Sequence, residues 1–326
     1  MTRRADSEKG ASLLSVLVIV MLMSAAAVAA TDALARSVSI AKSSGARSET
    51  FWTARSASDV AAAYLTKAMA TTEGVLNAES DLLANPITLP AGHGLVVFQL
   101  REASNCFNLN ALFEDKSGEA VGEGSLSAYR DLLVATGLNK AEAESLGEKL
   151  ADWIDTDHST RSYGAEDSYY ASQSEPYRPA NTRLRNISEL KSIAGYDADV
   201  MERIDGLVCL RPGIDQSKLN INTLSEAGAP LLVALFSSEL SDSDALSLIQ
   251  SRPVGGWSSL DAFMEEPEVK KISPDALRDT AVSIASSFLA ADIDIGTGDL
   301  VTSYQALYVR AESGTVSRVS MVRRDF

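Results

Sequence analysis

The chain has 326 residues, of which 44 are Asp or Glu and 29 are Lys or Arg, so its formal net charge is −15. This acidity argues against a nucleic-acid partner, because phosphate binding relies on clustered Lys and Arg. Two His residues leave little room for a His-based zinc site. With 45% apolar and 22% charged residues, the composition is that of a folded protein with one large domain or roughly two to three small ones.

The N-terminal segment carries the clearest signal. Residues 11–31 contain no charged side chain, and about 20 helical residues at about 1.5 Å each span the ~30 Å hydrocarbon core of a bilayer. Arg3, Arg4 and Lys9 precede this segment, and positive residues favour the cytoplasmic side of a membrane. We therefore expect the bulk of the chain to lie beyond the membrane.

Three interpretations of this segment compete. It could be a cleaved secretory signal, since small residues at 25–30 offer cleavage points, or it could be an uncut membrane anchor. The third interpretation is a prepilin-like leader that ends in Gly10, so that cleavage leaves Ala11 at the start of the apolar segment. Such a leader alone is a weak motif.

The residues that follow favour the third interpretation. Residues 32–72 contain no Pro, and small or apolar side chains recur at steps of three and four: Phe51, Ala54, Ala57, Ala61, Tyr64, Leu65 and Ala68. This spacing predicts an amphipathic helix that continues the apolar segment. A cleaved secretory signal has no reason to continue in this way.

Strand patterns lie near both ends of the remaining chain. Residues 94–101 read as one strand, and three more are expected at 287–295, 300–311 and 315–323, joined by Gly-containing turns. Helical spacing occurs between them, at 126–136, 139–154, 244–249 and 257–263. The prediction is an α+β fold, in which a long N-terminal helix packs on a small antiparallel sheet and a large helical insertion interrupts the strands.

The segment from Asp152 to Asp167 holds five carboxylates in 16 residues: Asp152, Asp155, Asp157, Glu166 and Asp167. Counted from Asp155, the order of oxygen-bearing residues follows an EF-hand loop, with Glu166 at the twelfth position. Thr160 occupies the sixth position, where an EF-hand has Gly. The spacing indicates a hard cation such as calcium, and the alternative is a solvated acidic loop. One His, His158, does not favour zinc.

Cys106 and Cys209 flank the first part of the helical insertion. Outside the cytoplasm a disulfide between them is permitted and would tie the base of the insertion. We favour this disulfide over two free buried cysteines.

Two other function classes are disfavoured. Residues 221–263 are similar to a DNA-binding helix-hairpin-helix element, but the turn at 236–242 has no Gly, and residues 215–271 contain nine acidic and four basic side chains. Phosphate would be repelled there. The sequence also lacks the Gly-x-Ser-x-Gly, His-Glu-x-x-His and Walker patterns of enzymes. We predict neither nucleic-acid binding nor catalysis.

Several segments together resemble the type II secretion system protein K family (GspK), the large minor pseudopilins. In chain order they are the leader ending in Gly10, Thr50–Ala57, Cys106–Leu112, Asp152–Asp157, Gly164–Asp167, Tyr169–Tyr170, Pro176–Asn181, Ser188–Leu190 and Leu219–Thr223. One position departs from the general pilin pattern, because Ser15 stands where most pilins carry Glu. The K family is known for this absence, which fits a place at the pilus tip.

The resemblance implies a specific role. The chain would be a pseudopilin of the bacterial inner membrane, single-pass, with its bulk in the periplasm. Prepilin peptidase would cut after Gly10 and leave Ala11 as a methylated N-terminus. The minor pseudopilins I and J would be its partners in starting the pseudopilus, with secreted exoproteins as further candidates, and the acidic loop would hold calcium.

The resemblance also divides the chain. We expect a leader at 1–10, a membrane part of the helix at 11–31, the spine helix and first strands at 32–112, an inserted helical (SAM-like) domain with the calcium loop at 113–205, a second helical unit at 206–280, and C-terminal strands at 281–326. The alternative function is a single-span periplasmic scaffold or binding module with an uncut anchor. Cleavage after Gly10 distinguishes the two.

Overall fold

A computed structural model of the chain describes residues 5–91, 94–114, 120–213, 215–236, 239–273, 281–297 and 300–324. The chain divides into two compact units, Met1–Ser56 and Ala57–Phe326. Three sequence features fall outside the described residues: Arg3 and Arg4 of the leader, the turn residues Gly298 and Asp299, and Ser237 and Ser238 of the hairpin-like turn.

The boundary between the two units falls inside helix α1 (Ala5–Ala70), which has 66 residues. The predicted long helix is confirmed, and its cause is local, because the segment lacks Pro and is rich in Ala, the best helix former. Among the described residues, this is the one helix that is long and apolar enough to cross a membrane, with a mean hydropathy of 2.7 in its most apolar window. The backbone of Gly10 and Ala11 is helical.

The second unit contains a five-stranded antiparallel sheet in the order β1-β2-β7-β8-β9. Its strands are β1 (Ile87–Ala91), β2 (Gly94–Glu102), β7 (Phe288–Thr297), β8 (Leu300–Arg310) and β9 (Val316–Arg324). The last four strands were predicted from their patterns and are confirmed. The edge strand β1 was not predicted, since it is short and contains Pro90, which central strands do not tolerate.

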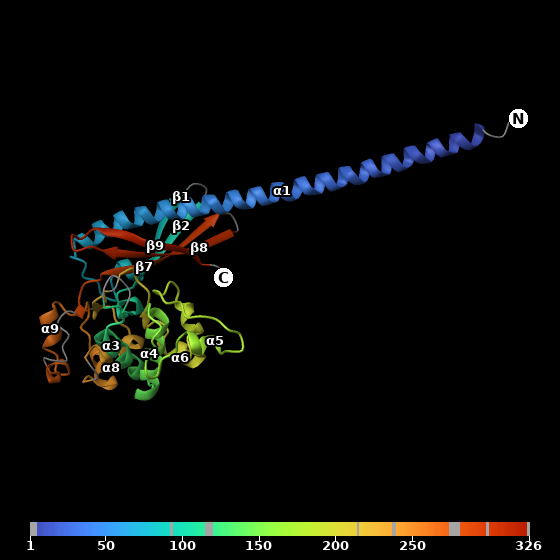
Figure 1. The fold of residues 1–326 in the computed structure, drawn as a ribbon. Helices are drawn as coiled ribbons and strands as arrows, with labels where there is room; N and C mark the ends of the chain where they lie inside the picture. The colour runs from blue at the N-terminus through green and yellow to red at the C-terminus, as the bar shows by residue number, and fades with distance from the viewer. Residues whose placement is uncertain are drawn as a thin grey trace. The chain divides into compact units, whose positions relative to one another are not determined.

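The last turns of α1 cover one face of this sheet (Figure 1). Ala57, Ala61 and Leu65 are buried on the helix. The hydroxyl groups of Ser58 and Tyr308 lie 2.6 Å apart, and Asp59 forms an ion pair with Arg318 at 2.9 Å. Because successive strand residues face opposite sides, alternate residues meet the helix and form this part of the core, namely Val96, Phe98, Leu100, Ile293, Tyr304 and Tyr308.

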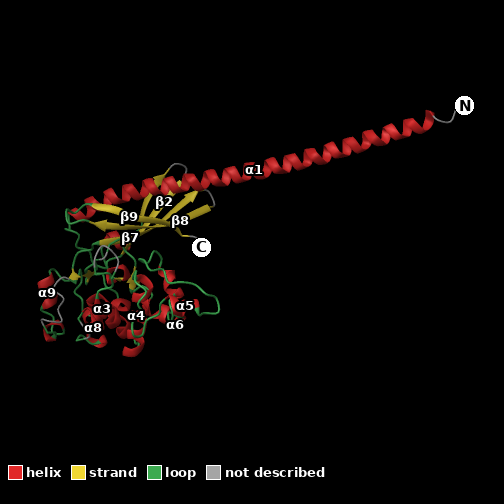
Figure 2. Cartoon of the chain, viewed as in Figure 1, coloured by secondary structure: helices red, strands yellow, loops and turns green. Residues whose placement is uncertain are grey.

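Short helices gather on the other side of the sheet (Figure 2). They are α3 (Glu123–Ala135), α4 (Lys140–Ile154), α5 (Asp167–Ala171), α6 (Ala198–Ile204), α7 (Ala229–Leu235), α8 (Asp242–Gln250) and α9 (Leu260–Met264), with the 3-10 helices η1 (Leu109–Leu112), η2 (Ile187–Ser192), η3 (Glu226–Gly228) and η4 (Val269–Lys271). One further helix, α2 (Asp81–Ala84), precedes β1. The helices share one continuous buried core that extends from Leu109 to Val282. The helical insertion expected from the sequence is therefore present.

Two pairs of very short parallel strands join the ends of the helical segments. β3 (Phe107–Asn108) pairs with β4 (Val208–Cys209), and β5 (Leu219–Asn220) pairs with β6 (Val282–Ser283). Each pair brings together the beginning and the end of one run of helices, residues 107–209 and 219–283. In both runs of helices, therefore, a pair of two-residue parallel strands joins the first residues of the run to its last residues.

Candidate functional site

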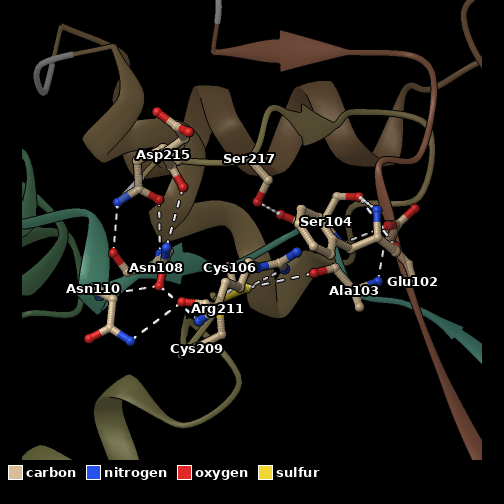
Figure 3. The surroundings of a disulfide bond; sticks show 12 residues. Glu102, Ala103, Ser104, Cys106, Asn108, Asn110, Cys209, Arg211, Asp215 and Ser217 are labelled. Atoms are coloured by element: carbon tan, nitrogen blue, oxygen red, sulfur yellow. Dashed lines mark hydrogen bonds between the residues drawn. A yellow bond between two sulfur atoms is a disulfide. The ribbon is translucent and has the colours of Figure 1, made fainter. Parts of the chain in front are cut away.

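The structure joins Cys106 and Cys209 by a disulfide at the junction between the sheet and the helices (Figure 3). Pairing of β3 with β4 places Asn108 opposite Cys209 and brings the two Cα atoms of the cysteines to 5.8 Å. This distance lies within the usual range for a disulfide. The bond closes the first helical run, and its two cysteines are 103 residues apart in the sequence.

Arg211 lies beside both sulfur atoms. Its Nη2 is 2.8 Å from the Sγ of Cys106, and its guanidinium lies over the ring of Phe288, 3.9 Å from the ring centre. The side chain is buried, and this burial lowers the pKa of Arg211 to about 10. Because Phe288 begins β7, Arg211 links the helical part of the unit to the sheet.

Asparagine side chains organise the two strand pairs. Asn108 accepts hydrogen bonds from the backbone N–H groups of Asn110 and Arg211 through Oδ1 and donates to the carbonyl of Asp215 through Nδ2 (Figure 3). In the second pair, Asn220 Oδ1 likewise accepts from the N–H of Asn222 at 3.0 Å. The segments Cys106–Leu112 and Leu219–Thr223, which carry part of the family resemblance, each contain an Asn-x-Asn sequence. The side chain of the first Asn in each bonds to backbone groups that such short strands leave without a strand partner.

The acidic loop follows α4 and returns to α5. Asp152, Asp155 and Glu166 are buried, with 0%, 2% and 2% of their surface exposed. Carboxylate oxygens of Asp155, Asp157 and Glu166 lie within 4.8 Å of one another, and so do ligand atoms of His158, Glu166 and Asp167. The structure thus brings four of the five predicted carboxylates into groups that could hold a metal ion. Asp152 is in neither group.

Three buried oxygen atoms of this region have no hydrogen-bond partner among the residues that the structure describes: Asp155 Oδ1, Glu166 Oε1 and Asn181 Oδ1. Buried polar atoms normally have partners, and carboxylate and amide oxygens are the ligands that calcium prefers. The residues present therefore fit a hard cation. The unpartnered oxygens are an observation of the fold, independent of the EF-hand-like spacing in the sequence.

Asn181 was missed as a candidate ligand from the sequence. It has a positive φ of 45°, and its N–H donates to the carbonyl of Trp153 at 2.9 Å, which holds it against the end of α4. Asn is among the few non-Gly residues that tolerate this conformation. In the sequence, the only sign of this role is an Asn directly after Pro179–Ala180. Folding brings Asn181 close to the acidic loop, where its Nδ2 lies 3.4 Å from Nδ1 of His158.

Burial changes the protonation of the loop. It raises the pKa of Asp155 to about 7 and the pKa of Asp152 to about 6, and neighbouring carboxylates add to the effect at Asp155. The pKa of Glu166 is also raised, chiefly by burial. A bound cation would favour the charged forms and so oppose these shifts.

Comparison with known proteins gave consistent matches. Two family models, both described as "Type II secretion system (T2SS), protein K", match residues 105–213 and 219–285. Type II secretion system protein K of Pectobacterium carotovorum subsp. carotovorum is 32% identical over 296 residues, 90% of each chain. The protein of that name from Klebsiella pneumoniae is 31% identical over 284 residues, 87% of each chain.

A solved structure extends the match to three dimensions. It is the crystal structure of the GspK–GspI–GspJ complex from the type 2 secretion system of enterotoxigenic Escherichia coli. A chain of that complex is 28% identical in sequence, with a TM-score of 0.71, over 87% of this chain and 99% of that one.

Proposed function

Because the chain belongs to the type II secretion system protein K family, we propose that it is a minor pseudopilin that assembles with the I and J minor pseudopilins at the tip of the pseudopilus. The observation that carries this proposal is the similarity of nearly the whole chain to a component of a K–I–J complex. The protein would start pseudopilus assembly and support exoprotein export as a structural component, without catalysis.

Co-expression with the I and J pseudopilins of the same system tests the partners. After extraction in detergent, the three chains are expected to elute together in size-exclusion chromatography, with the mass of a single copy of each. Elution of this chain without I and J would contradict the proposed assembly.

The membrane arrangement is part of the same proposal. Prepilin peptidase would cut after Gly10 on the cytoplasmic side, Ala11 would be methylated, the apolar part of α1 would cross the inner membrane, and the second unit would lie in the periplasm. The continuity of α1 from the apolar segment to the sheet supports this arrangement, because a secretory signal would be removed from the sheet-bearing part.

Intact mass and N-terminal sequencing of the membrane-extracted protein test the processing. A chain that begins at methylated Ala11 is expected. A chain that begins at Met1 would favour the alternative, a single-span scaffold with an uncut anchor, and a chain that begins near Thr31 would indicate a secreted protein.

We also propose that the acidic loop binds calcium. Asp155, Asp157 and Glu166 would supply carboxylate ligands, Asn181 would supply its unpartnered Oδ1, and Asp167 would contribute at the exposed side. The three buried oxygens without partners support this assignment. Calcium would supply positive charge that holds the loop between α4 and α5, and isothermal titration of the chelator-treated protein with calcium chloride measures its binding.

A further inference from the structure

We propose that Asp152, in the last turn of α4 beside the acidic loop, is not a calcium ligand, and that it forms a positioning pair with Arg161 that holds the loop in place around the ion. This inference rests on the proposed calcium site. It assigns two different roles to buried carboxylates that look alike in the sequence.

The contacts of Asp152 set it apart from the other buried acids. Both of its oxygens accept from the backbone N–H of Arg161, at 3.4 and 3.2 Å, and the Nε of Arg161 lies 3.5 Å from Oδ1. Asp155 and Glu166 each keep one buried oxygen without a partner. Both oxygens of Asp152 therefore share a backbone donor, whereas Asp155 Oδ1 and Glu166 Oε1 have no hydrogen-bond partner among the described residues.

Arg161 contacts three acids, of which Glu123 begins α3 and Asp152 and Asp155 lie at the end of α4. Its Nη1 donates to Oε1 of Glu123 on α3 at 2.9 Å, and its Nη2 lies 3.8 Å from Oδ2 of Asp155. The guanidinium thus ties the loop to α3 and to the end of α4. It also leaves the other oxygen of Asp155, Oδ1, free for an ion.

The charges explain why the pair must act together. Asp152 and Arg161 cancel each other, so the pair adds little net charge beside the ion. Removal of Asp152 alone would leave a partly buried guanidinium facing a divalent cation, and the two positive charges would repel each other at low dielectric. Removal of both partners would restore neutrality. If Asp152 were instead a ligand, removal of Arg161 could not replace the lost oxygen.

Calcium titration of the full chain in detergent distinguishes these cases. The variant Asp152→Asn is expected to bind calcium about 10–100-fold more weakly than the wild type, the usual effect of losing an outer-shell partner. The double variant Asp152→Asn/Arg161→Gln is expected to recover most of this loss. The matched control is Glu166→Gln with and without Arg161→Gln, in which the removal of Arg161 should restore nothing, because Glu166 is a proposed ligand and is not among the acids that Arg161 contacts.

The outcomes separate the inference from the calcium site itself. If the double variant binds as weakly as Asp152→Asn, Asp152 is a ligand and the inference is overturned, while the calcium site stands. If the wild type takes up no calcium, the calcium site fails. If near-ultraviolet circular dichroism shows that the double variant is unfolded, a crystal structure of the calcium-loaded wild type decides. Asp152 oxygens within about 2.3–2.6 Å of the ion would overturn the inference, and a longer distance would support it.

Discussion

Gly164 shows how closely the backbone of the acidic loop approaches a buried side chain. A Cβ added at Gly164 would lie 2.0 Å from Oδ2 of Asp152. Gly164→Ala is therefore expected to displace Asp152, to destabilise the protein by about 1–3 kcal/mol, and to weaken calcium binding. Urea denaturation and calcium titration measure both effects.

Gly124 provides the control for this substitution. It lies in the first turn of α3, and a Cβ added there would meet no atom of the described residues within 4 Å. Gly124→Ala is expected to leave calcium binding unchanged and to stabilise the protein by up to about 1 kcal/mol, because Gly weakens helices relative to Ala. Equal effects of the two substitutions would mean that the contact with Asp152 is unimportant.

The buried carboxylates also predict how stability depends on pH. The pKa of Asp155, about 7, and that of Asp152, about 6, both exceed the ordinary value of 3.8. Between pH 4 and pH 7 the folded, ion-free chain therefore binds more protons than the unfolded chain, so its stability falls as the pH rises. In EDTA, we expect a higher melting temperature at pH 5 than at pH 8.

Calcium should reverse this trend, because protons compete with the ion for the same oxygens. In saturating calcium chloride, the gain in melting temperature over EDTA is expected to be larger at pH 8 than at pH 5. A gain that does not change with pH would show that the buried carboxylates are not the groups that bind the ion.

At the scale of elements, the short strand pairs depend on side-chain amides. Asn222 donates to the carbonyl of Trp257 at 3.0 Å and accepts from its N–H at 2.8 Å, and both bonds are buried. Asn222→Ala would leave these backbone groups unpaired, at a cost of about 1–3 kcal/mol each. Chemical denaturation should show a loss of this size, whereas Asn85→Ala at an exposed position should change stability by less than about 0.5 kcal/mol.

The first helical run closes in the same way, with a disulfide added. Asn110 donates to the carbonyl of Leu184 at 3.1 Å, as Asn222 donates to that of Trp257. Asn110 follows β3 and bonds to Leu184, which precedes η2. Asn222 follows β5 and bonds to Trp257, which precedes α9. In the first run, the acidic loop lies between α4 and η2. The proposed calcium would therefore bind to a helical run whose two ends are already joined by β3, β4 and the disulfide.

At the scale of the whole molecule, the disulfide constrains the longest closed segment. Its ends are 103 residues apart, and a closed loop of about 100 residues is expected to gain about 4–5 kcal/mol from the reduced entropy of the unfolded chain. Cys106→Ala/Cys209→Ala should lower the free energy of unfolding by roughly this amount. If reduction of the wild-type disulfide lowers the free energy of unfolding by the same amount, the covalent bond, rather than the packing of the sulfur atoms, provides the stabilisation.

Removal of calcium should also be visible in the stability of the whole protein. Calcium at about 100 times its dissociation constant would stabilise the folded state by about 2.7 kcal/mol. We expect EDTA to lower the melting temperature of the wild type but not that of Asp155→Asn/Glu166→Gln. An equal response of both proteins would exclude these two carboxylates as ligands.

The sequence by itself determined the features that depend on local patterns. The absence of Pro and the Ala-rich composition predict α1, alternation predicts β2, β7, β8 and β9, and the spacing of acids predicts the loop that contains Asp155 and Glu166. Each of these signals is carried by neighbouring residues, whose side chains share a helix face or alternate along a strand.

Only the tertiary structure decided which distant residues meet. Strands of two residues, such as β3 and β4, are too short to show a period, and their pairing joins positions about 100 residues apart. Likewise, Asp152 and Asp155 are alike in the sequence, and Arg161 lies beside both of them. Only the fold directs the backbone N–H of Arg161 to both oxygens of Asp152 and leaves Oδ1 of Asp155 without a hydrogen-bond partner among the described residues. Two aspartates with the same chemistry can therefore have different roles, because the packing of the whole unit decides how deeply each is buried and which groups it contacts.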